Sequence, residues 1–212
     1  MFQETVTSQG RAALQLIHDR ASTRAYSSQE LDRSVVQTLL EAAIRAPTAL
    51  HQEPWSFVVV QDRALLKRIS DAAKPLFLRQ LDRISSPLPH PSDEFSDPHF
   101  NIFYDAGVLI VVCADSRLPF IEADCWLAAE NIMLASAAME LGSCAIGSAL
   151  PALNLISVKK ELGIPDDISA IAAVIVGVPH SRPVPTSRRA PRILSWKLAD
   201  SGSLLPARGK RD

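Results

Sequence analysis

The chain has 212 residues, which is the usual length of one domain or of a small two-lobed one. Hydrophobic residues make up 47% and charged residues 21%, so the chain can bury a sizeable core and is neither disordered nor fibrous. The 22 Lys and Arg residues nearly balance the 23 Asp and Glu residues, for a net charge of −1. This balance argues against nucleic acid as a partner.

The sequence contains no pattern typical of a membrane span, a secretory signal, a metal site or a disulfide framework. Residues 1–10 are polar, and the longest apolar stretch, residues 106–114, is far shorter than the ~20 residues of a spanning helix. There are three cysteines, an odd number without CxxC spacing, and the five histidines form no HExxH pair. We therefore expect a reduced, cytoplasmic protein with no metal and no membrane partner.

The spacing of apolar residues predicts helices that alternate with buried strands. We expect helices over residues 5–19, from an N-cap at Ser28 to Pro47, over 62–84 with a kink or split at Pro75, over 121–141 with Gly142 as C-cap, and over 155–162 before Gly163. Apolar runs predict strands at 57–60, 108–113 and 171–178, and a strand followed by a turn at 144–150.

The remaining segments are rich in proline. Residues 85–98 read as a long loop or lid, and residues 187–212 as a basic tail, of which 199–212 is expected to be flexible. With no repeat and no linker, residues 1–212 form a single predicted domain. The alternation of elements favours a three-layer sandwich of the α/β or α+β class.

Two polar segments stand out in the first quarter of the chain. Residues 20–24 place two guanidiniums and a hydroxyl within five residues, which suits an anion such as phosphate, although a solvated charged turn has the same composition. Residues 46–55 combine backbone carbonyls, a hydroxyl, an imidazole and a carboxylate beside a buried strand. The alternative for this second segment is a plain helix-to-strand loop in which Trp55 belongs to the core.

Two further segments follow the long alanine-rich helix. Residues 142–148 are small, so that a ligand could approach their backbone N–H groups, but they match neither GxGxxG nor GxSxG. The pair Arg188 and Arg189 comes soon after the last predicted strand, where a solvated basic tail is the simpler interpretation.

In their order and spacing, these four segments resemble the FMN-dependent nitroreductase family, from about residue 10 to residue 196. The family's Arg-x-Ser-x-Arg-x-aromatic motif is matched by Arg20, Ser22, Arg24 and Tyr26. Its Ala-Pro-Ser/Thr-Ala-x-Asn/His-x-Gln/Glu-Pro-Trp segment is matched at residues 46–55. The rest of the resemblance lies in Ala123-Asp124, Ala128, Asn131 and Leu134, in residues 141–147 and in residues 176–179.

The resemblance implies an α+β fold: a three-layer nitroreductase-like sandwich whose central mixed, mainly antiparallel sheet is flanked by helices, in a domain-swapped homodimer with FMN between the subunits. It assigns the FMN phosphate and the polar edge of the ring to the first motif, and flavin N5 to two backbone N–H groups. It brings one loop to the ring from the other subunit and assigns a phosphate contact to the late arginines. The cofactor-binding residues implied in this way are Arg20, Ala21, Ser22, Arg24, Pro47, Thr48, Ala49, His51, Gly147, Ser148, Arg188 and Arg189.

The activity implied by the resemblance is that of an FMN-dependent NAD(P)H oxidoreductase. NADH or NADPH reduces FMN, and a small-molecule acceptor such as a nitroaromatic or a quinone then takes the electrons in a ping-pong cycle. No catalytic side chain is required, because the flavin carries the chemistry. Residues 74–100 would form the lid that selects the acceptor.

Departures from the family pattern keep other readings open. Ala21 replaces a frequent second basic residue, and the His51-x-Glu53 form resembles the deiodinase branch of the superfamily. The alternatives are therefore a specialised flavin reaction (reductive dehalogenation, flavin fragmentation or dehydrogenation of a metabolite), or a flavin-binding buffer or sensor without turnover. Binding of nucleic acid through the basic tail is the least favoured reading.

Overall fold

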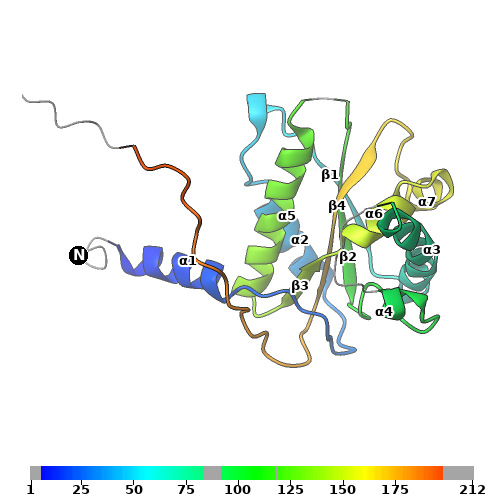
Figure 1. Cartoon of the computed structure of the whole chain (residues 1–212), viewed down its shortest axis with the longest axis horizontal. Coiled ribbons are helices and arrows are strands. Elements are labelled where there is room, and N and C mark those ends of the chain that lie inside the picture. Colours follow the sequence, from blue (N-terminus) through cyan, green and yellow to red (C-terminus); the bar gives the residue numbers. More distant parts are fainter. Residues whose placement is uncertain (1–5, 84–91, 118, 198–212) are drawn as a thin grey trace, which may run out of the picture.

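A four-stranded sheet forms the middle layer of the computed structural model, which describes residues 6–83, 92–117 and 119–197 (Figure 1). The strands stand in the order β1-β2-β4-β3, and each neighbouring pair is antiparallel. Their bounds are β1 (Ser56–Val60), β2 (Val108–Ala114), β3 (Gly142–Ala145) and β4 (Ser169–Gly177). Since β3 is an edge strand, its outer side is free to receive another segment of the chain.

Helices cover both faces of the sheet (Figure 1). One face packs against α2 (Arg33–Ala43) and α5 (Ile121–Ala138). The other face packs against α3 (Arg63–Leu81), α6 (Leu150–Leu153) and α7 (Ile156–Leu162), and α4 (Ser92–Ser96) lies beside α3.

Strand β2 contributes side chains to the hydrophobic cores on both faces of the sheet. All seven of its residues are buried. Successive side chains point to opposite faces of a strand, so Leu109 and Val111 enter the core beneath α3, whereas Ile110 and Val112 enter the core beneath α5. A continuous apolar run is therefore the expected sequence of a strand covered on both sides.

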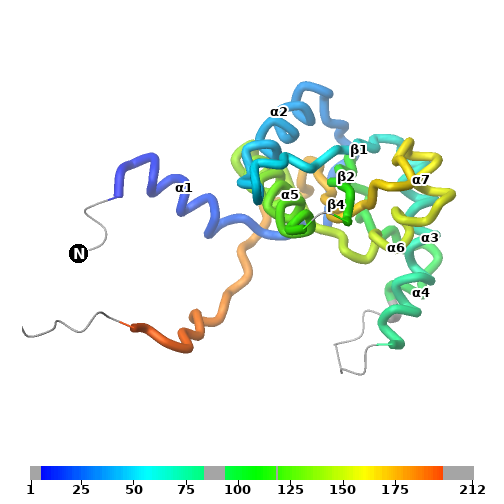
Figure 2. Tube along the Cα trace, turned by 90° about the horizontal axis from the view of Figure 1, so that it is seen from above, coloured from blue at the N-terminus to red at the C-terminus, as the bar shows by residue number. Residues whose placement is uncertain are grey.

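Two segments extend away from the sandwich (Figure 2). They are the first helix, α1 (Ser8–Asp19), and the chain that follows β4, residues 180–197. Helix α1 buries none of its residues, and Leu14 and Ile17 are 60% and 57% exposed. Although α1 contacts α5, its exposed apolar side chains have no packing partner among the described residues.

The predicted α+β class and three-layer sandwich are confirmed, and the sheet is antiparallel within the described residues, apart from one isolated parallel bridge between Ser22 and Ser143. Helix α7 ends as expected at Gly163, which takes a left-handed φ of 70°. The tail over 199–212 and half of the proposed loop, residues 84–91, lie outside the described residues. None of the helices in the described part of the chain is long and apolar enough to cross a membrane.

Two expected boundaries and the possible split of a helix at Pro75 are wrong, each for a local reason. Helix α2 begins at Arg33 rather than after Ser28, because the chain before it runs extended and buries Leu31, whose carbonyl accepts from Gln61 at 2.8 Å. Helix α3 continues through Pro75 without a break, since its apolar face is held against the sheet on both sides of that residue.

The end of α5 is the third correction. The helix stops at Ala138, because Glu140 takes the left-handed φ of 58° and the Leu141 N–H returns to the Ser136 carbonyl at 2.8 Å. Gly142 is therefore not a cap but the first residue of β3. The stretch expected as a continuous loop over 85–98 contains the short helix α4.

Candidate functional site

The Arg20–Arg24 segment lies along the free edge of β3. Ser22 forms a parallel bridge with Ser143, and the Thr23 N–H donates to the Ser143 carbonyl at 2.9 Å. Farther along, Tyr26 forms an antiparallel bridge with Pro179, just past the end of β4. The segment that follows α1 is thus fixed to the sheet by backbone pairing, with Arg20 at one end and Arg24 near the other.

Close contact between Thr23 and Gly142 makes this pairing possible. A Cβ atom at Gly142 would lie 2.7–2.8 Å from three atoms of the Thr23 side chain. Thr23 is 6% exposed, and its hydroxyl has no hydrogen-bond partner among the described residues. Only glycine leaves room for the segment at this distance from the sheet.

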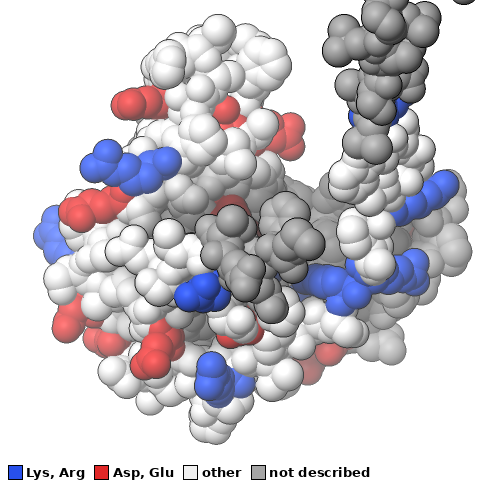
Figure 3. All heavy atoms as spheres, turned by 90° about the vertical axis from the view of Figure 1, so that its left-hand side faces the viewer, with Lys and Arg blue, Asp and Glu red and all other residues white. Residues whose placement is uncertain are grey.

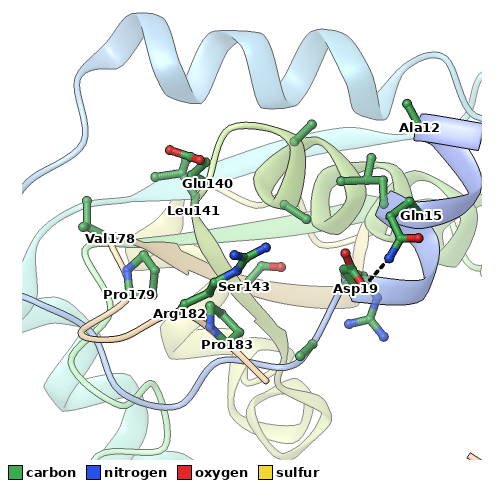
Figure 4. A pocket seen from close by; sticks show the side chains of 15 residues that line it. Ala12, Gln15, Asp19, Glu140, Leu141, Ser143, Val178, Pro179, Arg182 and Pro183 are labelled. Carbon is green, nitrogen blue, oxygen red and sulfur yellow. Dashed lines mark hydrogen bonds between the residues drawn. The ribbon is translucent and has the colours of Figure 1, made fainter. Parts of the chain in front are cut away.

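A cavity of about 750 Å³ opens where α1, the end of α5 and the start of β3 meet (Figure 4). This volume is within the ~300–1,000 Å³ typical of sites for small molecules and cofactors. Arg20 lines it from the end of α1, and Arg182 extends into it from the segment after β4. Two guanidiniums from distant parts of the chain therefore meet at one cavity.

Acidic side chains lie close to the arginines of this cavity. Arg20, whose side chain is 18% exposed, lies 3.6 Å from the Glu130 carboxylate on α5. Gln15 donates to Asp19 at 2.8 Å, and this hydrogen bond is the main reason why the pKa of Asp19 is lowered (Figure 4). Asp19 is thus a carboxylate at neutral pH, and its charge also attracts Arg182.

Arg24 lies beside two tyrosines that stay neutral. Burial raises the pKa of Tyr26, whose hydroxyl donates to the Thr23 carbonyl at 2.8 Å. Burial also raises the pKa of Tyr104, although a hydrogen bond from Arg24 opposes the shift. Because the phenol remains protonated, Arg24 keeps an unneutralised positive charge that can act on a ligand.

Gly147 and Ser148 come directly after β3, in the short helix η3 (Gly147–Ala149). Gly147 is exposed, and a Cβ atom there would meet nothing within 4 Å, so its backbone faces open space. The cavity with Arg20 and Arg182 lies at the start of β3, where Ser22 pairs with Ser143, and η3 follows the other end of the strand. The segment with Arg24 continues past the start of β3 to Tyr26, which pairs with Pro179. Of the predicted binding residues, only Arg20 and Ala21 line the cavity itself.

The structure does not bring the remaining predicted residues to this edge. Pro47, Thr48, Ala49 and His51 lie around the short helix η2 (Ala49–His51), next to the N-terminal end of α5. The cavity is lined by Ala137 and Ala138, at the C-terminal end of that helix. Eighteen residues of α-helix span roughly 27 Å, so the two sets lie far apart within one chain.

Arg188 and Arg189 are exposed on the segment that extends away from the sandwich, and neither lines the cavity. The arginine that does line it, Arg182, was not among the predicted site residues. Its only sequence signal is its position three residues after Pro179, which makes it the basic residue nearest to the end of the last strand.

Other classes of site find no support in the described part of the chain. It contains no group of three or more His, Cys, Asp or Glu side chains that could hold a metal ion. The three cysteines are free and buried, and burial raises the pKa of Cys113 to about 11 and that of Cys125 to about 12. On the face from which α1 projects, acidic and basic side chains are interspersed (Figure 3).

Comparisons with known proteins agree with this geometry. The model of the nitroreductase family matches residues 17–178. A protein of Archaeoglobus fulgidus, named provisionally as an NADH dehydrogenase/NAD(P)H nitroreductase, is 31% identical over 171 residues, which cover 78% of this chain and 84% of the relative.

Solved structures share the fold at lower identity. A nitroreductase of Bacteroides fragilis with bound FMN superposes with a TM-score of 0.71 at 22% identity, covering 89% of this chain and 98% of that one. An iodotyrosine deiodinase bound to FMN and 3-iodo-L-tyrosine gives a TM-score of 0.71 at 21% identity, covering 88% and 100%. From the residues matched and the fold that they form, the chain belongs to the nitroreductase family.

Proposed function

We propose that this chain is an FMN-dependent NAD(P)H oxidoreductase that works as a homodimer. The observation that carries the proposal is the cavity with two guanidiniums at the start of β3, together with the open backbone of η3 after the other end of that strand. Cationic groups at one end and backbone donors at the other suit a ligand with a phosphate and a polar planar ring.

The residues at the cavity fit the phosphate end of FMN. A phosphate is best held by more than one charged donor, because each guanidinium can form two parallel hydrogen bonds to it. Ala21 provides no such donor where a basic residue is frequent in the family, whereas Arg182 reaches the cavity from the other side. We infer that Arg20 and Arg182 together bind the phosphate, with Ser22 beside them.

Arg24 and η3 fit the ring end. When bound, FMN supplies the two-electron chemistry, and the protein binds, orients and tunes it. The unneutralised charge of Arg24 favours negative charge on a neighbouring ring. The N–H groups of Gly147 and Ser148 would orient the ring edge, and no nucleophilic side chain is needed.

A second copy of the chain would complete the site. The Pro47–His51 loop lies at the other end of α5 from the cavity, so it cannot reach a ligand bound there in its own subunit. The exposed apolar side chains of α1, together with Ile193, Leu194 and Trp196 after β4, offer surfaces for such a partner. This arrangement supports the domain-swapped dimer implied by the family resemblance.

The second substrate would enter above the ring, where residues 74–100 would shape the space. NADH or NADPH is the proposed reductant, and a nitroaromatic, a quinone or a related small molecule is the proposed acceptor. The free, buried cysteines suit a reducing compartment, and we expect the protein in the cytoplasm.

Reductive dehalogenation is a second candidate, favoured by the likeness to iodotyrosine deiodinase. His51 and Glu53, which give the chain its deiodinase-like motif, are both exposed in the loop at η2. A halogenated phenol therefore belongs in the panel of acceptors, next to a nitroaromatic and a quinone.

Binding of FMN and of riboflavin, which lacks the phosphate, tests the assignment directly. Arg20→Ala and Arg182→Ala should each weaken FMN binding by roughly 1.5–3 kcal/mol and leave riboflavin binding nearly unchanged, because only FMN has the charged group. The measurement is quenching of flavin fluorescence during titration of the apoprotein.

Arg188→Ala and Arg189→Ala are the matched controls, since these side chains do not line the cavity in this chain. If they weaken FMN binding and Arg182→Ala does not, the late pair binds the phosphate and Arg182 does not. A wild-type protein that binds no flavin rejects the proposed function. Flavin that binds tightly but is reduced by neither NADH nor NADPH would instead indicate a buffer or sensor.

A further inference from the structure

The loop between α2 and β1 has an unusual backbone. Leu50, His51 and Glu53 have positive φ values of 56°, 53° and 43°, and none of them is glycine. This conformation is unfavourable for residues other than glycine and persists only where the surrounding structure holds it. A loop that is strained at three positions needs an anchor outside itself.

Asp124 is that anchor. It lies in the first turn of α5 and is 4% exposed. Both of its carboxylate oxygens lie 3.2 Å from the backbone nitrogen of Ala49, which is 75 residues away in the sequence. The carboxylate thus accepts from the first residue of η2, and the start of a helix is a favourable place for its negative charge.

The residue that donates this hydrogen bond, Ala49, belongs to a loop with a predicted role in flavin binding. Ala49 belongs to the loop that would lie against the partner subunit's flavin under the proposed function, and it directly follows Pro47 and Thr48. A buried charge is costly unless it is hydrogen-bonded, and a side chain that only filled space here would not need one.

We propose that Asp124 is a positioning residue that acts through the Ala49 N–H to set the height of the Pro47–Ala49 loop over the flavin. The inference rests on the proposed function. Displacement of a group by about 1 Å at a reacting centre can cost on the order of 100-fold in rate, so the anchor controls the chemistry without touching the reacting atoms.

Asparagine is the informative replacement at this position. It has the same size and shape, but its amide nitrogen is a donor. Since both carboxylate oxygens now face one N–H, the amide would bring its own N–H groups toward that of Ala49. Asp124→Asn therefore disturbs the contact while the volume of the side chain is kept.

Ala49→Pro removes the other half of the contact. Proline has no N–H, and it is tolerated in the first position of a helix, which Ala49 occupies in η2. The residue before it, Thr48, has φ −127° and ψ 145°, which is the conformation that a following proline favours. Glu122→Gln is the matched control, because it removes an exposed carboxylate from the same turn of α5.

The experiment uses the flavin-loaded protein and measures the rate of flavin reduction by NADPH or NADH in a stopped-flow instrument, together with the midpoint potential of the flavin. Asp124→Asn should slow reduction by about 10- to 100-fold and shift the potential, whereas Glu122→Gln should change neither. Adding Asp124→Asn to Ala49→Pro should slow reduction no further, since both changes break the same hydrogen bond.

A purely structural role would lower the melting temperature of Asp124→Asn but leave the rate and the potential of the folded, loaded protein at wild-type values. That result would overturn the inference, and so would fully additive effects in the double variant. Failure of the proposed function is distinguishable from either result, because the wild-type protein would then hold no flavin or would show no reduction.

Discussion

The absence of a Cβ atom at Gly142 allows the Arg20–Arg24 segment to approach the sheet closely. Gly142 and Thr23 are already in contact, so the position of Ser22 against Ser143 depends on the absence of one methyl group. The same residue pair connects stability to binding, because Arg20 and Arg24 stand on either side of Thr23. The contact between Gly142 and Thr23 is therefore part of both the packing and the proposed ligand site.

Gly142→Ala should therefore do two things. It should lower the free energy of unfolding by roughly 1–3 kcal/mol, since an added methyl group overpacks the contact with Thr23, and it should weaken FMN binding by moving both arginines. Urea unfolding followed by circular dichroism, together with a titration with FMN, measures both effects.

Gly147→Ala is the control for the stability measurement, because a Cβ atom there would meet nothing within 4 Å. If both alanine variants unfold like the wild type, the close contact at Gly142 does not constrain the segment.

Lys74 connects helix α3 to the segment that follows α4. Its side chain is 8% exposed, and its ammonium donates to the carbonyls of Asp97, Pro98 and Phe100 at 3.0, 3.2 and 2.9 Å and lies 3.2 Å from Asp71. A row of aromatic rings continues from this point, in which Phe77 contacts Phe95, Phe95 contacts Phe100 and Phe100 contacts Tyr104. The segment proposed as a lid is thus tied both to α3 and to the neighbour of Arg24.

Lys74→Met should cost roughly 2–3 kcal/mol of stability, because three carbonyls lose a charged donor in a partly buried place. Lys67→Met, two helical turns earlier, should lower the free energy of unfolding by about 0.5 kcal/mol or less, since Lys67 forms an exposed ion pair with Asp71. Denaturant unfolding of the two variants tests the difference, and equal costs would show that Lys74 does not hold the segment.

The elements with continuous apolar runs or clear helical spacing were predictable from the sequence. Strands β1, β2 and β4 and helices α5 and α7 lie within a few residues of their expected places. The features that the sequence did not predict depend on tertiary contacts and on local backbone conformation. Glu140 ends α5 in a conformation that its side chain does not favour, and Pro75 stays inside α3 because packing on both sides holds the helix.

At the scale of the whole molecule, two segments project from the sandwich. Helix α1 and the chain after β4 extend away from it, while the loop at η2 lies at the far end of α5 (Figures 1 and 2). Under the proposed function, a second copy would both bury these segments and complete the site. We expect flavin binding and dimerisation to depend on each other.

A double variant, Leu14→Glu and Ile17→Glu, should dissociate the dimer and release FMN, because both side chains are exposed on α1 in the single chain and a charge would prevent their burial. Sedimentation velocity recorded at 280 nm and in the flavin band measures mass and cofactor together.

Gln9→Glu adds a charge to an exposed position of the same helix and serves as the control. A double variant that remained a flavin-loaded dimer would place the interface elsewhere, and a flavin-loaded wild-type monomer would contradict the proposed assembly.

The candidate site was predictable only as far as it is local in sequence. Residues 20–24 and 147–148 form motifs, and the structure places them along one strand. Arg182 belongs to none of the motifs, and although Asp124 is part of the family pattern, the sequence does not indicate that Ala49 is its partner. These contacts join residues that are distant in the sequence, so they are seen only in the folded chain.

The position of β4 within the sheet has a consequence for how the protein is made. It pairs with both β2 and β3, yet it is the last of the described strands to leave the ribosome. Until residue 177 has emerged, β3 has no described strand beside it and the wall of the cavity cannot close. Strands β1 and β2 emerge earlier, so their apolar side chains must be covered by the helices already made until β4 completes the sheet.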